Sequence, residues 1–466
     1  GITAYVSRLT GAGEHEKARQ YATVGVIAGL LLGALITVTG LLFGEAPVKM
    51  MVTSADGNVD WQLAEKTRQY SWDFMSIMFI SLAGVGVQFA AVSVFNSLGR
   101  TMFPMWLLII SNVANLIGNI LLVPRYEVAG SAMSTLITTA LSAVVATVWL
   151  QRQKAIRISL RAVLDSERLR AGFMRGWEMF RLGLPVTVQV MARSLSMLTM
   201  TKLITYLPNT NSVVGQGALQ VGLQVESLAF MPAFAFSTAA ATLVGQNLGA
   251  GRPDQARQST IFCLWGSQIV MVTFGLAQMI WPAFFIHLFI GNGPEVEAIV
   301  KPASDYIRIL GACLPGLGLG LTMMGALRGS GDTKITAYMS LAAMYVVRIP
   351  LAVFLSMENI GGTGLGLGWG LNGLWWAMTA SVYVEALLAW LRFRSGAWAK
   401  IKLGAEHEEL LESRLATDSD AELGRDIEVL EAEFPSQVVV LADPLISDPT
   451  SQQPQATLKG KDKRES

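Results

Sequence analysis

Cysteine and histidine are scarce in this sequence of 466 residues. Only two cysteines are present, Cys263 and Cys313, and each lies within an apolar run, which argues against a disulfide framework or a cysteine metal cluster. The three histidines fall in separate regions without the spacing of a zinc site, so we expect no metal site and no cofactor. Paired catalytic groups are also missing from the apolar segments, and we expect no enzymatic activity.

Charge is the second deficit. Charged residues make up 15% of the chain and hydrophobic residues 52%, whereas a soluble domain carries about 25% charged residues. Mean hydropathy is +0.45. The net charge of +1 gives no reason to expect nucleic acid as a partner. The composition therefore predicts a protein that has membrane lipid as its solvent.

Long uncharged runs are what the sequence has instead. A helix needs about 20 apolar residues to cross a bilayer. Ten runs meet this need, and the sequence predicts an all-α polytopic membrane protein. The predicted spans are 21–43, 74–98, 102–124, 128–151, 182–207, 212–244, 259–290, 307–327, 335–356 and 370–391.

Basic residues divide the chain and predict its orientation. Alternate connections carry lysine or arginine, as at Lys17, Arg100, Arg252 and Arg328, and such loops are typically cytosolic. The predicted domains are an N-lobe at 1–151, a basic cytosolic linker at 152–177, a C-lobe at 178–398 and a polar cytosolic tail at 399–466, too polar to fold on its own. We expect a multi-pass protein of the plasma or inner membrane with a cytosolic C-terminus.

An internal repeat relates the two lobes. Gly11-Ala12-Gly13 followed by Ala18-Arg19-Gln20 recurs as Gly249-Ala250-Gly251 followed by Ala256-Arg257-Gln258, an offset of 238 residues. The string 97–101 matches 330–333 at a similar offset. Repeats of this kind are typical of secondary transporters, with the substrate site between them. By symmetry, we expect the sequence to lack one complete helix and most of a second before Gly1.

Three strings resemble the multidrug and toxic compound extrusion (MATE) family. The longest comprises Glu226–Pro232 and Ser237–Gly251, which resemble the eighth helix of that family. Gly325–Thr333 resembles the turn after its tenth helix, and Arg348-Ile349-Pro350 resembles its eleventh. The resemblance covers residues 1–398. It implies twelve helices in two six-helix lobes, a central cavity open to one side at a time, and export driven by a proton or sodium gradient.

Charged residues inside the apolar spans are the main functional candidates, because a charge at the centre of a membrane helix costs about 2.5 to 3.5 kcal/mol. Arg193, Glu226, Arg348 and Glu385 meet this criterion. We expect Glu226 to bind the coupling ion, with a static ion pair to Arg193 as the alternative. Arg348, beside Pro350, and Glu385 are expected to serve as partners of other groups.

The resemblance adds residues and also differs from the family pattern. Arg193 stands where one branch of the family has a cation-binding glutamate, which puts sodium binding by that scheme in doubt. Asn115 and Asn119 resemble an Asn-x-x-x-Asp pattern of the first lobe, with Asn119 in place of the carboxylate. Both are expected to take part in ion coupling, although hydrogen bonding between helices would explain them equally well.

An adaptable apolar cavity with few polar groups is expected to hold the substrate. We predict that it is lined by Asn112, Gln189, Met191, Arg193, Phe230 and Met231.

The predicted function is a monomeric secondary antiporter, with H⁺ or Na⁺ as the coupling ion, that exports small cationic or amphipathic organic molecules. The alternatives are a flippase for a lipid-linked oligosaccharide, which would need an arginine cluster, and a non-functional fragment.

Overall fold

The computed structural model describes residues 1–46, 61–152, 166–207, 212–290, 294–359, 364–401 and 403. Within these ranges all regular structure is helical, and residues 1–401 form one compact unit. The middle of the predicted linker and the predicted tail from residue 404 lie outside the described residues. The last part of that linker is helical, because α6 already begins at Ser166.

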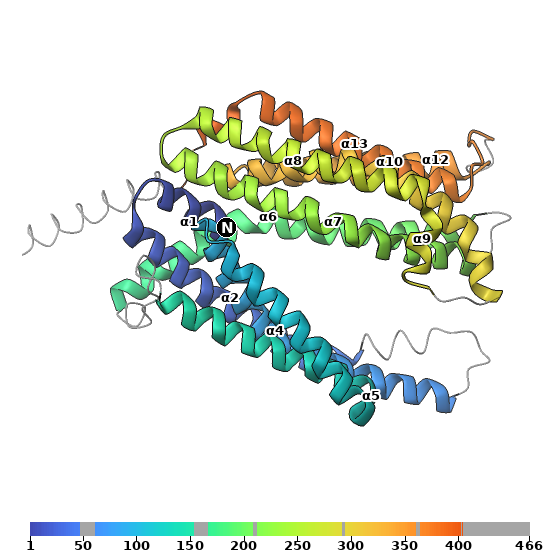
Figure 1. Ribbon diagram of the computed structural model, residues 1–466, viewed down its shortest axis with the longest axis horizontal. Helices are drawn as coiled ribbons and strands as arrows, with labels where there is room; N and C mark the ends of the chain where they lie inside the picture. The colour runs from blue at the N-terminus through green and yellow to red at the C-terminus, as the bar shows by residue number, and fades with distance from the viewer. Residues whose placement is uncertain are drawn as a thin grey trace, which may run out of the picture. The chain divides into compact units, whose positions relative to one another are not determined.

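Four helices form the N-lobe, the name used here for α1 to α5. They are α1 (Ile2–Gly11), α2 (His15–Phe43), α4 (Trp61–Ser97) and α5 (Met102–Arg152). Helix α4 packs between α2 and α5 (Figure 1). Helix α5 contains two predicted spans, and its backbone breaks at Glu127, where φ is 51° and ψ is −129°. The break follows Pro124, which cannot donate a helical hydrogen bond.

The C-lobe, α6 to η3, is built around α10 (Pro294–Ser330). This helix packs against α7 (Ser212–Gly249), α8 (Pro253–Ile280) and α13 (Leu371–Arg394). The remaining elements are α6 (Ser166–Thr205), α9 (Pro282–His287), α11 (Thr333–Leu341), η2 (Ala342–Arg348), α12 (Ile349–Ser356) and η3 (Ala397–Lys400). The predicted span 259–290 is divided between α8 and α9, because the chain leaves the helical conformation at Trp281, just before Pro282.

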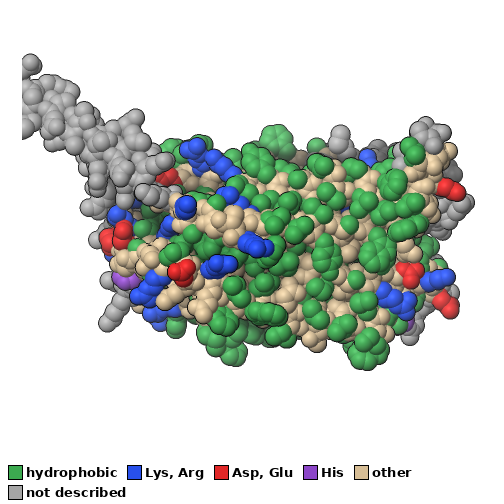
Figure 2. Space-filling model, turned by 90° about the horizontal axis from the view of Figure 1, so that it is seen from above, with side chains coloured by type: hydrophobic (Ala, Val, Ile, Leu, Met, Phe, Trp, Pro, Cys, Tyr) green, Lys and Arg blue, Asp and Glu red, His purple; other side chains and the backbone are tan. Residues whose placement is uncertain are grey.

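Eight helices in the described ranges are long and apolar enough to cross a membrane. This confirms the predicted all-α polytopic membrane fold. Helix α6, which contains the predicted span 182–207, is not among the eight, because polar and basic residues such as Gln189, Arg193 and Lys202 lower its hydropathy. Hydrophobic side chains cover much of the length of the face in Figure 2, with acidic side chains at its two ends.

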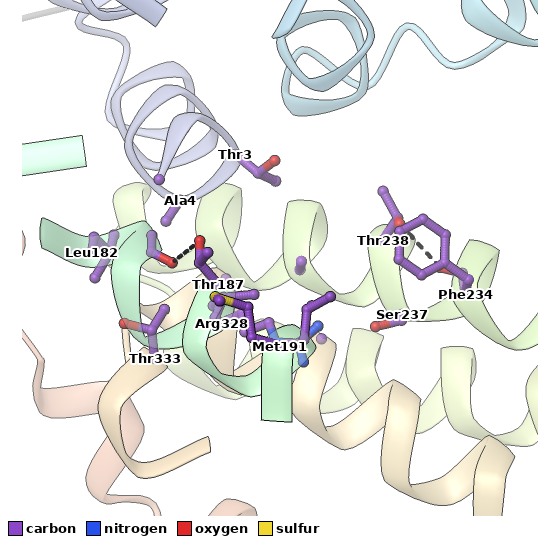
Figure 3. A pocket seen from close by; sticks show the side chains of 17 residues that line it. Thr3, Ala4, Leu182, Thr187, Met191, Phe234, Ser237, Thr238, Arg328 and Thr333 are labelled. Carbon is purple, nitrogen blue, oxygen red and sulfur yellow. Dashed lines mark hydrogen bonds between the residues drawn. The ribbon is translucent and has the colours of Figure 1, made fainter. Parts of the chain in front are cut away.

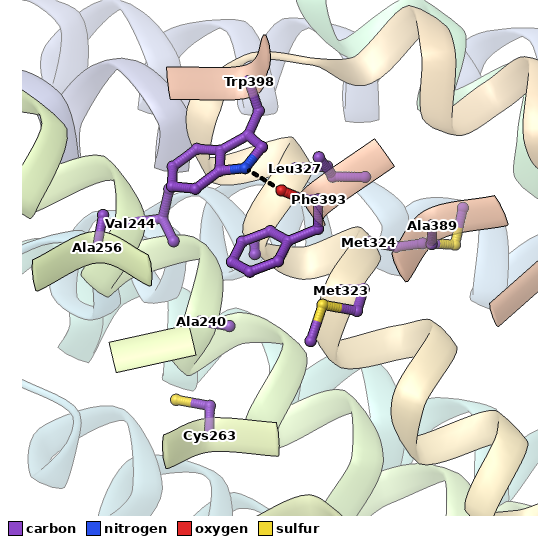
Figure 4. Close-up of a cluster of buried hydrophobic side chains, with 11 residues drawn as sticks. Ala240, Val244, Ala256, Cys263, Met323, Met324, Leu327, Ala389, Phe393 and Trp398 are labelled. Carbon is purple, nitrogen blue, oxygen red and sulfur yellow. Dashed lines mark hydrogen bonds between the residues drawn. The ribbon is translucent and has the colours of Figure 1, made fainter. Parts of the chain in front are cut away.

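The four turns of the repeat lie at one end of this unit, which we call the turn end. It comprises turns 11–14, 98–101, 249–252 and 331–332, and hydrogen bonds from Arg8 to Ser330 and from Gln246 to Ser97 join the adjoining helices. Both Gly-Ala-Gly turns are therefore on the same side. At this end a cluster of buried side chains joins α7, α8, α10, α13 and η3 (Figure 4). In it Trp398 stacks on Phe393 and donates to its carbonyl at 2.7 Å.

Candidate functional site

A chain of polar side chains crosses the C-lobe and joins four of its elements. The Arg328 guanidinium donates to Gln189 Oε1 at 2.8 Å, and Gln189 Nε2 donates to Ser340 Oγ. The Ser340 hydroxyl donates to Glu385 Oε1, and Arg193 approaches Glu385 Oε2 at 3.5 Å. These five residues, which we call the C-lobe polar chain, lie on α10, α6, α11 and α13. Gln189 is 3% exposed and Glu385 is 5% exposed.

Arg348 and Glu226 lie beside this chain. Arg348, at the end of η2, is buried and donates from Nε to Ser381 Oγ at 2.8 Å. It is close enough to interact electrostatically with Arg193, Glu385 and Glu226. Glu226, on α7, accepts a hydrogen bond from the hydroxyl of the buried Tyr306 at 3.2 Å. The alternative pairing of Glu226 with Arg193 is wrong, because Arg193 pairs with Glu385 instead.

The helix that carries Ser340 and Arg348 is irregular between them. Residues Ala342–Arg348 form the π-helical segment η2, and Pro350 is the second residue after it. Wider turns of this kind are frequent at functional sites. Within η2, the Tyr345 hydroxyl donates to the Ala192 carbonyl of α6 at 3.1 Å. The irregular segment is therefore bonded to the helix that carries Gln189 and Arg193.

A cavity of about 500 Å³ lies where α1 meets the C-lobe, next to one end of the C-lobe polar chain. Its walls come from α1, α6, α7, α10 and α11 (Figure 3). Val186, Val190, Met191 and Phe234 supply apolar surface, and Thr187, Ser237 and Thr238 supply hydroxyl groups. Arg328 is the one charged side chain among the described residues that line it. Such a mixture suits an amphipathic ligand, since pockets are mostly apolar with a few polar groups.

In the N-lobe, a cluster of neutral polar groups holds the two halves of α5 together. Asn115 Nδ2 donates to the hydroxyls of Ser134 and Thr135, each at 3.3 Å, and Ser134 donates to the Asn115 carbonyl at 2.8 Å. Asn119 Nδ2 donates to Asn115 Oδ1 at 3.2 Å, while Asn119 Oδ1 is buried without a partner in the described structure. Asn115 therefore bonds the two halves of α5 to each other, while Asn119 bonds only to Asn115 on its own half.

The predicted cavity residues lie in different places. Met191 lines the cavity, whereas Gln189 and Arg193 belong to the C-lobe polar chain behind it. Phe230 is half-buried and packs against Phe234, which lines the cavity. Asn112 and Met231 are exposed and do not line it. Whether any of these residues contacts a substrate stays a prediction.

Ser340, Arg328 and Tyr306 were missed as members of the site by the sequence reasoning. Arg328 was interpreted as a loop residue that sets orientation, and Ser340 carries no charge that would mark it inside a span. Serine can hydrogen-bond across membrane helices, and this was the one available signal. Within the described residues, no group of three or more metal-binding side chains is found.

Comparisons with known proteins agree with this architecture. The MatE family model matches residues 1–121 and 185–354. A probable multidrug resistance protein NorM of Thermotoga maritima is 23% identical over 411 residues, covering 86% of this chain and 81% of the relative. The multidrug resistance protein NorM of Burkholderia vietnamiensis is 28% identical over 401 residues, covering 84% of this chain and 80% of the relative.

A solved structure shares the fold. It is described as the outward-facing conformation of a multidrug resistance MATE family transporter of the MOP superfamily, and it superimposes with a TM-score of 0.73 at 18% identity. The match covers 86% of this chain and 84% of that one. The resemblance in the sequence strings is thereby confirmed. Because the family model matches more than half of the residues, the chain belongs to the MatE family of multidrug and toxic compound extrusion transporters.

Proposed function

We propose that this protein is a secondary antiporter that exports small amphipathic organic compounds, cations among them, in exchange for H⁺ or Na⁺. It works as a monomer in the plasma or inner membrane, with the turn end in the cytosol. It performs no chemical reaction on its substrate. The observation that carries the proposal is the C-lobe polar chain, in which the buried carboxylate of Glu385 is contacted by side chains from two other helices, Ser340 of α11 and Arg193 of α6.

Glu385 supports ion coupling through the partners it holds. One of its oxygens accepts from Ser340 and the other attracts Arg193. A proton or sodium ion on this carboxylate would compete with Arg193 for its charge and weaken the link between α6 and α13. A ligand shifts a conformational equilibrium only if it binds the two conformations with different affinity. The contact between Glu385 and Arg193 would provide this difference, because the ion would bind Glu385 more tightly in a conformation where that contact is broken. Glu226, the carboxylate expected from the sequence, contributes a second site beside it.

The substrate class follows from the walls of the cavity. Its apolar surface and hydroxyl groups are suited to amphipathic compounds of varied shape, and Met191 can repack around them. Three arginines and two glutamates lie in or beside the C-lobe polar chain, so positive charge alone does not select the substrate. Neutral and cationic amphipathic compounds are the substrates that we propose.

The flippase alternative requires arginines that can reach a pyrophosphate. Of the three arginines in or beside the C-lobe polar chain, only Arg328 lines the cavity, and a single arginine is not the cluster that a flippase would need; Arg348 is bonded to Ser381 and Arg193 to Glu385. The antiporter is therefore preferred. A lipid-linked pyrophosphate moved across vesicles, with no movement of amphipathic dyes, would favour the flippase.

The purified protein in vesicles is expected to move an amphipathic cationic dye when a pH or Na⁺ gradient is imposed. The rate should fall to the background of protein-free vesicles when the gradient is collapsed with an ionophore. Dye fluorescence measures the movement, and a neutral dye of similar size tests the charge requirement. If neither dye moves faster with either gradient than without one, the proposed function is wrong.

A further inference from the structure

Two polar side chains in equivalent positions of the repeat tie the lobes together at the turn end. Arg8 lies on α1 and Gln246 lies on α7. They are separated by 238 residues, since 246 minus 8 is 238, which is the offset of the two Gly-Ala-Gly turns. The repeat therefore places these two different residues at the same position of the two lobes.

Their partners are also equivalent, and each bond crosses to the other lobe. Arg8 donates from Nη1 to the Ser330 carbonyl at the end of α10, at 3.4 Å. Gln246 Nε2 donates to the Ser97 carbonyl at the end of α4, at 2.8 Å. Ser97 and Ser330 begin the second pair of matching strings. Each lobe thus donates a side-chain hydrogen bond to a backbone carbonyl of the other lobe, at equivalent positions of the repeat.

The two bonds lie on a closely packed crossing. Ser7 and Gly11 of α1 face Gly245 and Gly249 of α7, and these pairs are again related by the same offset. A Cβ added to Gly11 would lie 1.9 Å from the Gln246 carbonyl oxygen, and one added to Gly249 would lie 1.9 Å from that of Arg8. Small residues at this spacing allow two helix backbones to touch. Arg8 also donates to the Ile401 carbonyl at 2.6 Å, which adds the segment after α13 to the junction.

We infer that Arg8 and Gln246 form a reciprocal latch that holds the turn end closed, and that opening this end requires both bonds to break. The inference rests on the proposed function, in which the lobes must separate at this end during each cycle. Both acceptors are backbone carbonyls, so the latch is independent of side-chain identity in Ser97 and Ser330. It also differs from the C-lobe polar chain, which lies within one lobe.

Cysteine labelling measures how often the latch opens. Cys263 and Cys313, both buried, are replaced by alanine. The buried Ser330 is then changed by Ser330→Cys, which keeps the carbonyl that Arg8 binds. In the purified protein, the rate of reaction with a polar maleimide is proportional to the fraction of time that this position is uncovered. Protein stability of each variant is checked by its Tm in the same detergent.

Gln246→Ala is expected to speed labelling about five-fold, the factor given by one net hydrogen bond. Arg8→Ala removes the bonds to both Ser330 and Ile401 and should speed labelling at least as much, and the double variant should exceed both. Asn247→Ala is the matched control, because Asn247 donates to the Leu243 carbonyl of its own helix and to Ser259 of α8, both within the C-lobe. Arg252→Gln removes a positive charge from an exposed position at the same end. Both controls are expected to label at the parental rate.

An unchanged labelling rate in the double variant, with an unchanged Tm, would overturn the latch. An equal acceleration in Asn247→Ala would overturn it as well. The assay needs no transport, so its result is separable from that of the proposed function. Latch-dependent labelling without any gradient-driven dye movement would defeat the antiporter and leave the latch standing.

Discussion

Replacing Glu385 by glutamine is expected to slow gradient-driven transport at least ten-fold while the protein remains folded. Glutamine keeps an oxygen that can accept from Ser340, but it removes the charge that attracts Arg193. Breaking one partner of a buried pair costs about 3 to 5 kcal/mol, and the cost is smaller here because the Arg193 side chain is 36% exposed. Initial rates of dye movement in vesicles, with and without the imposed gradient, measure the effect.

The matched control is Asp305→Asn, which removes a carboxylate from an exposed ion pair with Arg308 on α10. This variant is expected to transport at the rate of the unaltered protein. Glu226→Gln is expected to lose pH-dependent coupling too, with a smaller effect on the rate, because an amide oxygen can still accept from Tyr306. Full gradient dependence in Glu385→Gln would assign the coupling ion to another group.

A methyl group at the crossing of α1 and α7 is expected to force the turn end apart. In Gly249→Ala the new Cβ would lie 1.9 Å from the Arg8 carbonyl oxygen, whereas ordinary contact begins at 3.4 Å, so the helices must separate by about 1.5 Å (3.4 minus 1.9). Overpacking of this kind typically destabilises by about 1 to 3 kcal/mol. We expect a lower Tm and faster labelling of the Ser330→Cys background than either latch variant shows.

Gly11→Ala should give the same result, because its Cβ meets the Gln246 carbonyl oxygen at the same distance. The control is Gly84→Ala on α4, where the nearest atoms are 3.5 Å or more away and a methyl group fits. A Tm and a labelling rate for Gly249→Ala that match those of Gly84→Ala would contradict the close crossing.

Much of the fold could be predicted because single segments of sequence determine it. Each of the ten apolar runs is mainly helical in the described structure, one of them divided between α8 and α9, and the break in α5 falls at Glu127, between the two runs that it separates. The repeat also placed both Gly-Ala-Gly turns on one side, since an even number of crossings returns the chain to the same face.

The pairing of charges could not be predicted in the same way. Arg193 and Glu226 lie on consecutive spans and suggested a pair, but the rotation of each helix about its axis depends on its packing, which is mainly against α11 for α6 and against α10 for α7. That rotation brings Arg193 to Glu385, which is far away in the sequence. The π-helical segment η2 changes the direction of Arg348 and has no reliable signature in a single sequence. The latch was accessible in principle, because applying the 238-residue offset to Arg8 gives Gln246.

The most direct test of antiport is to impose a gradient of an amphipathic cationic dye across vesicles that have no initial ion gradient. With a pH-sensitive or Na⁺-sensitive probe inside, we predict that dye leaving the vesicle drives H⁺ or Na⁺ inward, and that Glu385→Gln reduces this ion movement at least ten-fold. Dye movement with no accompanying movement of either ion would contradict the antiporter.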